Sequence, residues 1–401
     1  MKIPFSPPDI TEQDIEAVGE ALRSGWITTG QRTKTLETKL ADYVSTPACI
    51  CLSSQTACAE MALRLLGVGE GDEVVTTAYT YTATASVVCH VGAKLVLVDT
   101  QKDSFEMDYD ALSHAITPAT KVVIPVDLAG VPCDYDKIFG VLESKKHLFT
   151  PNNQLQEAFG RVIVLADTAH ALGAVYHDQM VGSVADFSAF SFHAVKNLTT
   201  AEGGALTWRH IEGVEDSLLY GQLKLLSLHG QSRDALEKNA LCNWEYDVLG
   251  TWYKCNMTDM SAALGLSQLS RYDGMLSRRR QIIERYDTSL APLGLDLLEH
   301  FTNTYTSSGH LYLTRIPSVR REERDAIIAQ MAQRGVACNV HYKPLPMLTA
   351  YKNMGFDIKD FPNAYARYQN QITLPLYSRM TDEEVDYVIQ NYTDVVRTYI
   401  S

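Results

Sequence analysis

Short apolar segments alternate with segments of helical periodicity through the first half of the chain. Strand-length apolar segments recur at residues 49–52, 73–77, 94–99, 121–126, 162–166, 187–192 and 205–208. The stretches between them are mostly long enough to hold a helix. This alternation predicts a mostly parallel sheet with helices packed on its faces. We therefore predict the α/β fold class, with residues 1–250 forming one large domain.

The pattern changes after residue 258 to a long helical stretch, followed from about residue 300 by a mixture of short elements. Strand-like segments at 310–316 and 337–342, and helix-like segments at 321–334 and from 381 onward, predict a smaller α+β unit. Residues 251–401 are thus expected to comprise linking helices and a small C-terminal α+β domain. Three successive arginines, Arg278 to Arg280, are interpreted as a solvated helix face.

Local signals predict the ends of several elements. Thr11 and Asp14 resemble a capping box ahead of Ile15, Val18 and Leu22, a spacing that predicts a helix with one apolar face. The glycine-rich segment 67–72 follows a helical pattern and precedes a strand, so we interpret it as a turn rather than a nucleotide-binding loop. The polar stretch 143–157 is expected to be an exposed insertion.

Composition narrows the classes of function. The 401 residues include 35 Lys and Arg against 48 Asp and Glu, a net charge of −13 that argues against a nucleic-acid or anionic-membrane surface. The eight cysteines form no C-x-x-C pair, so we expect reduced thiols and no metal site. Neither an apolar signal segment nor a run of about 18 apolar residues is present, which favours a cytoplasmic location and no membrane association.

An acid and a lysine follow two of the predicted strands. Asp167 ends the apolar segment 162–166, and Lys196 comes shortly after the segment 187–192. Ligands bind at the carboxyl edge of such sheets. Taken singly, Asp167 could cap a helix and Lys196 could be a surface lysine. Pyridoxal phosphate (PLP) gives a reason for both, because it needs a lysine amine for its Schiff base and a carboxylate facing its ring nitrogen.

A hydroxyl-rich segment lies where a phosphate group could be held. Residues 53–57, with sequence SSQTA, stand between a predicted strand and a predicted helix. Backbone N–H groups at a helix N-terminus bind anions. The same segment could equally be a helix cap with no ligand. Ser191 offers a further hydroxyl near Lys196.

Nine segments, taken in order, resemble the DegT/DnrJ/StrS family of sugar-nucleotide aminotransferases. They are GWITTG at 25–30, SSQTA at 53–57, GDEVV at 71–75, TY at 80–81, DTAHALG at 167–173, FSFHAVKN at 190–197, AEGG at 201–204, NMTD at 256–259 and LPL at 374–376. The resemblance covers nearly the whole chain. It implies a fold type I PLP-dependent transferase, similar to aspartate aminotransferase, whose large domain binds the cofactor.

The resemblance also implies roles for individual residues. Lys196 would form the Schiff base and transfer protons, Asp167 would pair with the pyridine nitrogen, and His170 would lie beside the phenolic oxygen of PLP. Tyr81 would stack on the cofactor face. The phosphate group would be bound by Thr56, Ala57 and Ser191.

Further implied contacts involve a second subunit and the substrate. Lys254 stands where many relatives carry an asparagine that reaches the phosphate of the neighbouring subunit, so the resemblance implies a homodimer with shared active sites. The substrate would contact Thr29, Gly30 and His341, with Lys343 near its diphosphate. Each of these four residues could equally be structural.

The implied reaction moves the amino group of L-glutamate to a keto-sugar nucleotide. The segment around Lys254 resembles the branch that acts on C4 of UDP-linked 4-keto-6-deoxy-hexoses, for surface polysaccharide or glycan biosynthesis. A C3 sugar-nucleotide or cyclitol aminotransferase stays open as an alternative, and a non-catalytic PLP-binding regulator is a remote one. Relatives with histidine in place of the lysine are dehydratases, so Lys196 favours amino transfer. Gln55 and Thr168 depart from the residues usual in the family.

Overall fold

A seven-stranded sheet forms the centre of the computed structural model, which describes residues 1–234, 236 and 245–400. The strand order is β1-β9-β8-β5-β4-β2-β3, and β9 alone runs antiparallel to its neighbours. The strands are β1 (Ala48–Leu52), β2 (Glu73–Thr77), β3 (Lys94–Val98), β4 (Thr120–Ile124), β5 (Ile163–Asp167), β8 (Phe187–Ser191) and β9 (Gly204–Trp208). All seven correspond to predicted segments, and the predicted α/β fold class is confirmed.

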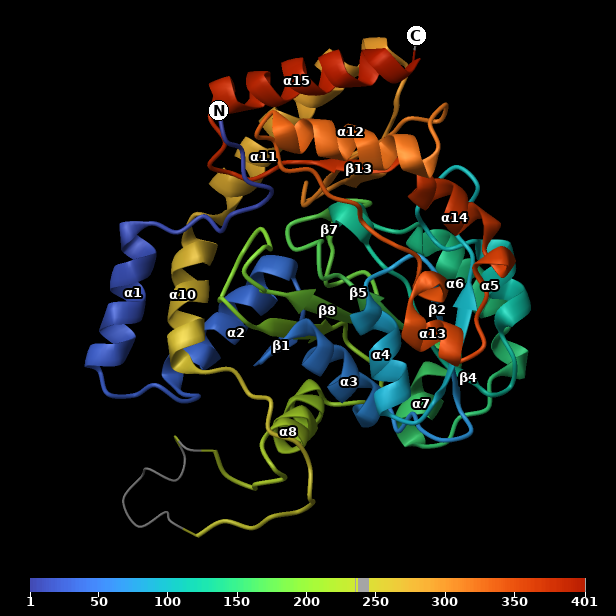
Figure 1. The fold of residues 1–401 in the computed structure, drawn as a ribbon. Coiled ribbons are helices and arrows are strands. Elements are labelled where there is room, and N and C mark those ends of the chain that lie inside the picture. The colour runs from blue at the N-terminus through green and yellow to red at the C-terminus, as the bar shows by residue number, and fades with distance from the viewer. Residues whose placement is uncertain (235, 237–244, 401) are drawn as a thin grey trace.

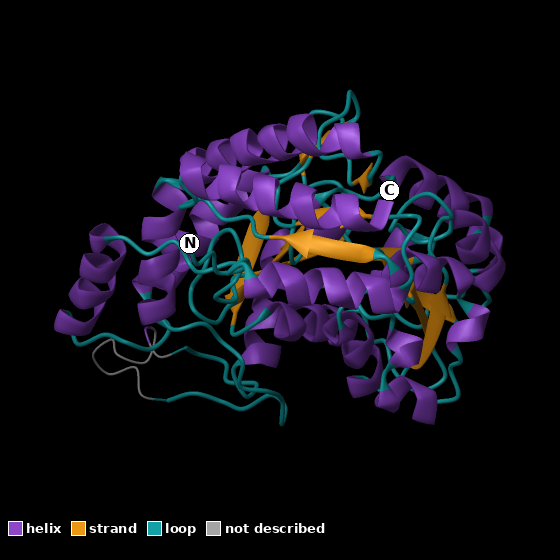
Figure 2. Ribbon diagram, turned by 45° about the horizontal axis from the view of Figure 1, so that its top comes forward, coloured by secondary structure: helices purple, strands orange, loops and turns teal. Residues whose placement is uncertain are grey.

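Helices cover both faces of this sheet (Figures 1 and 2). Most of them are the helices that the sequence predicted between the strands. In the first half they are α1 (Glu12–Arg23), α2 (Gln31–Val44), α3 (Gln55–Leu65), α4 (Thr82–His90), α5 (Tyr109–Ala115), α6 (Tyr135–Ser144), α7 (Gln154–Phe159) and α8 (Asp216–Ser227). The glycine-rich segment 67–72 is the turn between α3 and β2, as predicted.

Helix α1 begins with the predicted capping box, in which Thr11 and Asp14 exchange hydrogen bonds. Its predicted apolar face, however, is not the buried one. Ile15 and Leu22 are 56% and 53% exposed, whereas Asp14 is buried. The carboxylate of Asp14 accepts hydrogen bonds from Gln268 and Arg271, so α1 docks through this polar contact together with the buried Ala21 and leaves Ile15 and Leu22 outward.

The C-terminal part adds helices and a second sheet at one end of the molecule, where both termini also lie (Figure 1). Strands β10 (Asp296–Leu297), β12 (Tyr312–Arg315) and β13 (Gln371–Leu374) form this sheet, and β11 (Tyr305–Thr306) joins β6 (Val175–Tyr176) and β7 (Gln179–Met180). The helices are α10 (Asp259–Ser270), α11 (Tyr272–Leu290), α12 (Arg321–Gln333), α13 (Thr349–Asn353), α14 (Pro362–Gln369) and α15 (Asp382–Ile400). The division near residue 250 stays a prediction.

Two predictions for this part are wrong. Residues 337–342 form no strand, because only Asn339 pairs with β13, at Thr373, before the chain turns toward the central sheet. Arg279 is buried rather than solvated, and its guanidinium donates hydrogen bonds to the carbonyl oxygens of Gly309, His310 and Leu376. Its neighbours Arg278 and Arg280 make ion pairs near the surface.

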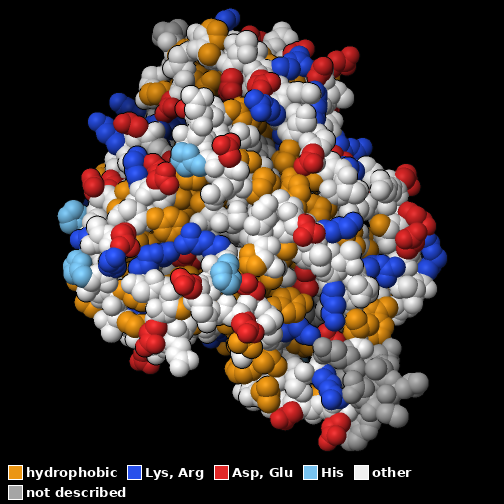
Figure 3. All heavy atoms as spheres, turned by 180° about the vertical axis from the view of Figure 1, so that it is seen from behind, with side chains coloured by type: hydrophobic (Ala, Val, Ile, Leu, Met, Phe, Trp, Pro, Cys, Tyr) orange, Lys and Arg blue, Asp and Glu red, His pale blue; other side chains and the backbone are white. Residues whose placement is uncertain are grey.

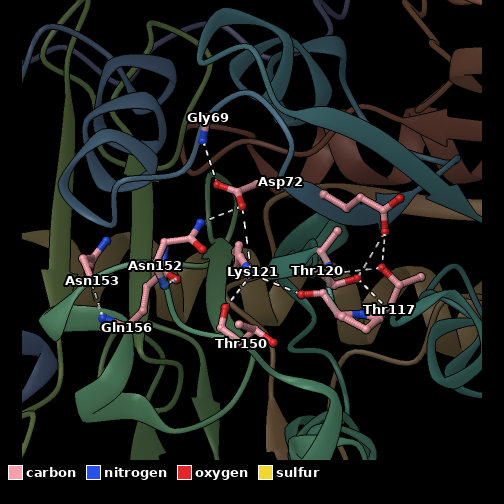
Figure 4. Close-up of polar contacts among 12 residues, drawn as sticks. Gly69, Asp72, Thr117, Thr120, Lys121, Thr150, Asn152, Asn153 and Gln156 are labelled. Atoms are coloured by element: carbon pink, nitrogen blue, oxygen red, sulfur yellow. Dashed lines mark hydrogen bonds and ion pairs between the residues drawn. The ribbon is translucent and has the colours of Figure 1, made fainter.

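The stretch 143–157 is mostly exposed, as predicted, but it is tied to the sheet rather than loosely inserted (Figure 4). Asn152 donates a hydrogen bond of 2.8 Å to Asp72, and Gln156 donates one of 2.8 Å to the carbonyl of Leu66. Lys121 of β4 donates to the carbonyl of Thr150 at 2.6 Å. The buried Gln156 side chain therefore anchors the segment beside the amino ends of β2 and β4.

The surface and the cysteines fit an ordinary globular protein. Acidic and basic side chains are interspersed over the back face, where the described residues form no broad basic area (Figure 3). Seven cysteines are free thiols, and Cys242 lies outside the described residues. Among the helices that the structure describes, none combines the length and apolar character needed to cross a bilayer.

Candidate active site

A cavity of about 510 Å³ lies at the carboxyl ends of β5 and β8 and at the N-termini of α3 and α4. Residues from the large sheet and from the C-terminal part both contribute to its wall. The lining residues are Ser54, Gln55, Thr56, Thr80, Tyr81, Ala83, Val126, Asp167, Ala169, His170, Ser191, His193, Val195, Lys196, Glu202, Gly203, His341 and Tyr342. The position matches the carboxyl edge at which α/β sheets bind ligands.

Asp167 is the last residue of β5 and is buried in this wall. Its carboxylate accepts a hydrogen bond of 2.6 Å from the Thr84 hydroxyl on α4 and one of 3.2 Å from the backbone N–H of Ala169. Burial raises the pKa of Asp167, and these hydrogen bonds and the charge of Lys196 partly offset that effect. A cation placed beside this carboxylate would stabilise its charged form.

Lys196 lies in the connection between β8 and β9 and points to the same cavity. Its backbone is held in a turn by a hydrogen bond of 2.9 Å to the carbonyl of His193. Burial lowers the pKa of the Lys196 amine from 10.5 to about 8, while the nearby Asp167 acts in the opposite direction. The amine is thereby brought close to the neutral, nucleophilic form near physiological pH.

The N-terminus of α3 forms a polar corner of the cavity. Ser54 is the N-cap and accepts a hydrogen bond of 3.0 Å from the N–H of Ala57. Strand pairing sets both Leu52 of β1 and Ser191 of β8 opposite Gly204 of β9. A side chain at Gly204 would come within 2.4 Å of the backbone of Ser54 and Gln55. This close approach brings the hydroxyls of Ser54, Thr56 and Ser191 to one cavity, a suitable site for an anion.

Aromatic and imidazole side chains form the remaining wall. Tyr81, the residue before α4, is 59% exposed, and its ring lies 5.9 Å from that of Tyr342. The Nε2 atom of His170 lies 3.2 Å from the Tyr342 hydroxyl. His341 stacks on Phe5 at 5.4 Å, and burial lowers its pKa to about 3.

Five of the predicted site residues lie outside the cavity wall. Ala57 follows Thr56 on α3. Thr29 contacts Asn256 and Met257, and the Gly30 N–H donates to Asp259, the first residue of α10, at 2.8 Å. The Lys254 ammonium contacts Asn256 of its own chain, and Lys343 is exposed. Among the described residues, no group of three or more His, Cys, Asp and Glu side chains is placed to hold a metal ion.

The site residues that were not predicted from the sequence include Thr84, Tyr342 and His310. Thr84 lies one helical turn after Tyr81, which is a weak local signal that both face the same way. His310 packs against His170 with ring centroids 4.4 Å apart, although 140 residues separate them in the chain. No local pattern marks such a contact.

The geometry can be tested against PLP. A buried carboxylate, a lysine amine with a lowered pKa and a hydroxyl-rich helix N-terminus line one cavity. These groups match the ring nitrogen, the aldehyde and the phosphate of that cofactor. The fold and the site together define a PLP-dependent enzyme of fold type I.

Comparisons with known proteins establish the family. The model of the DegT/DnrJ/EryC1/StrS aminotransferase family matches residues 8–393, and the chain belongs to this family. The spore coat polysaccharide biosynthesis protein SpsC of Bacillus subtilis is 35% identical over 399 residues, which cover 98% of this chain and 97% of SpsC.

Solved structures give the same assignment. The PLP form of the putative sugar aminotransferase Spr1654 from Streptococcus pneumoniae matches with a TM-score of 0.96 and 53% identity over 100% of both chains. Its PMP form matches with a TM-score of 0.97 and 54% identity over 99% of this chain and 100% of that one. Helicobacter pylori PseC, an aminotransferase involved in the biosynthesis of pseudoaminic acid, matches with a TM-score of 0.83 and 26% identity over 100% of both chains. This chain is thus a PLP-dependent sugar aminotransferase.

Proposed function

We propose that the enzyme transfers the amino group of L-glutamate to C4 of a UDP-linked 4-keto-6-deoxy-hexose, for surface polysaccharide or glycan biosynthesis. The observation that carries the proposal is the pairing of Asp167 and Lys196 in one cavity that is open on its Tyr81 side. SpsC is a spore coat polysaccharide biosynthesis protein and PseC an aminotransferase involved in the biosynthesis of pseudoaminic acid, which supports a glycan precursor as the substrate.

We assign the chemistry to three side chains. PLP, when bound, supplies an electron sink for the bond-breaking step. Lys196 would hold the cofactor through its amine and, once released, would move a proton at the reacting carbon, as general base and then as general acid. Asp167 would pair with the ring nitrogen and stabilise positive charge there. His170 would present an N–H group to the phenolic oxygen.

The phosphate group is assigned to the N-terminus of α3. Thr56, Ala57 and Ser191 supply hydroxyl and backbone N–H donors, and Lys254 of the partner subunit supplies a cation. The dimer is supported by apolar side chains close to Lys254 in sequence, because Val248, Leu249 and Tyr253 are 50%, 57% and 38% exposed. A second copy of the chain would cover these side chains.

We assign the sugar nucleotide to the outer part of the cavity. His341 is one of the residues that line the cavity. Thr29 and Gly30 lie near Asn256 and Asp259, on the same side as Lys254, and Lys343 follows Tyr342 toward solvent. We assign Lys343 to the diphosphate because an exposed ammonium suits a flexible anionic group.

A panel of sugar nucleotides tests the proposal. PLP-loaded enzyme is incubated with L-glutamate and each of several 4-keto and 3-keto sugars, linked to UDP, dTDP or GDP, and a keto-cyclitol, while 2-oxoglutarate release is measured. We expect turnover with UDP-linked 4-keto sugars. The Lys196→Ala variant serves as the blank, and its rate of 2-oxoglutarate release should be lower by about 10²–10⁴-fold. Turnover with only 3-keto sugars or the cyclitol would contradict the C4 assignment.

We also propose a cytoplasmic location. The seven described cysteines are free thiols, four of them buried, which is the usual state in a reducing compartment. Labelling of intact cells with a membrane-impermeant reagent should leave the protein unmodified.

A further inference from the structure

The proton on His170 is located by its hydrogen bonds. The Nδ1 atom of His170 accepts a hydrogen bond of 3.1 Å from the backbone N–H of Ala129. A ring nitrogen that accepts from an N–H group carries no proton, so the proton of the neutral ring is on Nε2. That nitrogen lies 3.2 Å from the Tyr342 hydroxyl, at the cavity wall.

The turn that presents Ala129 is rigidly held. Ala129 has a φ of 61°, which is unusual for a residue other than glycine. The buried Asp127 accepts hydrogen bonds from the Cys133 N–H at 2.9 Å and from the Tyr135 hydroxyl at 3.0 Å. At Gly130, whose φ is 90°, a side chain would come within 2.1 Å of the Ser308 hydroxyl oxygen. The turn is therefore held by hydrogen bonds to Asp127 on one side and packs closely against Ser308 on the other.

A second contact fixes the ring of His170 from the C-terminal part. The ring of His310 lies 4.4 Å away and is tilted by 40°. The Asn197 amide donates a hydrogen bond of 2.9 Å to the Ser308 carbonyl, so its oxygen must face the Nδ1 atom of His310, which lies 2.9 Å from it. His310 therefore carries its proton on Nδ1. Asn197 directly follows Lys196, so this pair connects the lysine segment to His170.

The surroundings of the two histidines favour the neutral form of both. Burial lowers the pKa of His170 well below its usual value, and the positive charge of Lys196 acts in the same direction. The pKa of His310 is lowered by burial and by His170, Lys196, Arg279 and His341. A second proton on either ring would add positive charge near Lys196, and none of the contacts described above brings a carboxylate to either ring.

We propose that His170 acts as a neutral hydrogen-bond donor through Nε2, and that Asn197 and His310 are positioning residues for it. The inference rests on the proposed site, in which His170 faces the cofactor. A neutral N–H donor stabilises an oxygen anion of a bound ligand without adding positive charge near Lys196. An imidazolium at the same place would lower the pKa of that lysine further and compete for the anion.

Nuclear magnetic resonance of the ring nitrogens tests the tautomers directly. PLP-loaded enzyme labelled with ¹⁵N-histidine is recorded between about pH 6 and pH 9, a range that spans the ordinary histidine pKa. Spectra of His170→Gln and His310→Gln identify the two rings by their missing signals. We expect an Nε2–H pattern for His170 and an Nδ1–H pattern for His310, with neither titrating. A titrating His170, or one protonated on Nδ1, would overturn the proposal.

A set of variants tests the positioning role. His310→Phe keeps an aromatic ring but loses the hydrogen bond to Asn197, and Asn197→Leu removes the acceptor. We expect each to lower kcat roughly tenfold with KM for glutamate changed less than about twofold, because a displaced group affects the reacting geometry. Each should also shift the pH midpoint of the visible absorption band of the PLP-loaded enzyme.

The matched control is His300→Phe, which alters another buried histidine of the same region. His300 bonds to Ser307 and stacks on Tyr312, with no contact to His170 among its bonds and ring partners. It should leave the absorption midpoint unchanged. If all three variants shift the absorption midpoint equally, His310 and Asn197 act only on general stability and the proposal fails. A wrong sugar substrate would leave these spectra unaffected, so the two proposals fail separately.

Discussion

The amine of Lys196, a half-buried residue, shows how much the pKa of a side chain depends on its surroundings. In water a lysine with a pKa of about 10.4 is almost fully charged at pH 8. Burial lowers the pKa of Lys196 to about 8, so about half of the amine is neutral at that pH. The nearby Asp167 carboxylate raises it and keeps the shift moderate. The residue is thus reactive without being permanently uncharged.

The reaction of cofactor-free enzyme with PLP should follow this ionisation. We expect the rate of adduct formation, trapped with borohydride and measured by mass spectrometry, to rise with pH through a midpoint of about 8 and then level off. In Asp167→Asn the midpoint should move to lower pH, because the carboxylate that favours the charged amine is gone. A midpoint above pH 10 in the unmodified enzyme would contradict the burial of Lys196.

Much of this chemistry could be predicted at the residue scale. Asp167 ends one strand and Lys196 comes shortly after another, and the local sequence predicts both strands. In a parallel sheet the carboxyl ends of such strands lie at the same edge. Thr84, Tyr342 and His310 could not be found in this way. Their partners, Asp167 and His170, are far from them in the chain, and no periodicity encodes that contact.

At the scale of elements, periodicity predicted the helices better than their faces. The spacing of Ile15, Val18 and Leu22 correctly gave a helix, but α1 docks through Asp14 and Arg271 instead. Helix α7 was not predicted, because the polar stretch 143–157 was expected to be an exposed insertion. Its buried Gln156 accepts from the Asn152 N–H and donates to the Leu66 carbonyl, both at 2.8 Å.

Replacing that glutamine should cost stability without affecting the site. Gln156→Leu leaves the Asn152 N–H without its acceptor, a loss of about 1–3 kcal/mol in the free energy of unfolding. Denaturant unfolding should show this loss, and the absorption spectrum with PLP should stay unchanged. Gln154→Leu, at an exposed position of the same helix, is the control and should stay within about 0.5 kcal/mol. Equal effects of the two changes would show that α7 is not anchored through Gln156.

At the scale of the whole molecule, the cavity combines distant parts of the chain. The large sheet and its helices contribute lining residues from 54–56, 167–170 and 191–203. The C-terminal part contributes His341 and Tyr342. One side stays open beside Tyr81 and Val195, which are 59% and 41% exposed. The proposed dimer would complete this side and bring Lys254 of the partner subunit to the phosphate.

Complementation of two inactive variants tests the shared site. Lys196→Ala removes the reactive amine, and Lys254→Glu places a carboxylate where a phosphate would bind, so each homodimer should be nearly inactive. In a mixed dimer one of the two sites would contain both natural lysines. Co-expression of differently tagged chains, followed by two affinity steps, should therefore restore about half of the activity per dimer. Mixed dimers as inactive as the parents would show that the sites are not shared.

The sequence by itself determined the strands of the large sheet, most helices, the α/β class and the acid and lysine at the strand ends, because hydrophobic periodicity and local turn chemistry act between near neighbours. Only the tertiary structure decided which helix faces are buried, that Arg279 and Gln156 are anchors, and that His310 and Tyr342 meet His170. These outcomes depend on packing between segments that lie from 30 to more than 250 residues apart in the chain. Burial then sets the pKa values of Lys196 and His170, since the desolvation of a charge depends on what surrounds it in space.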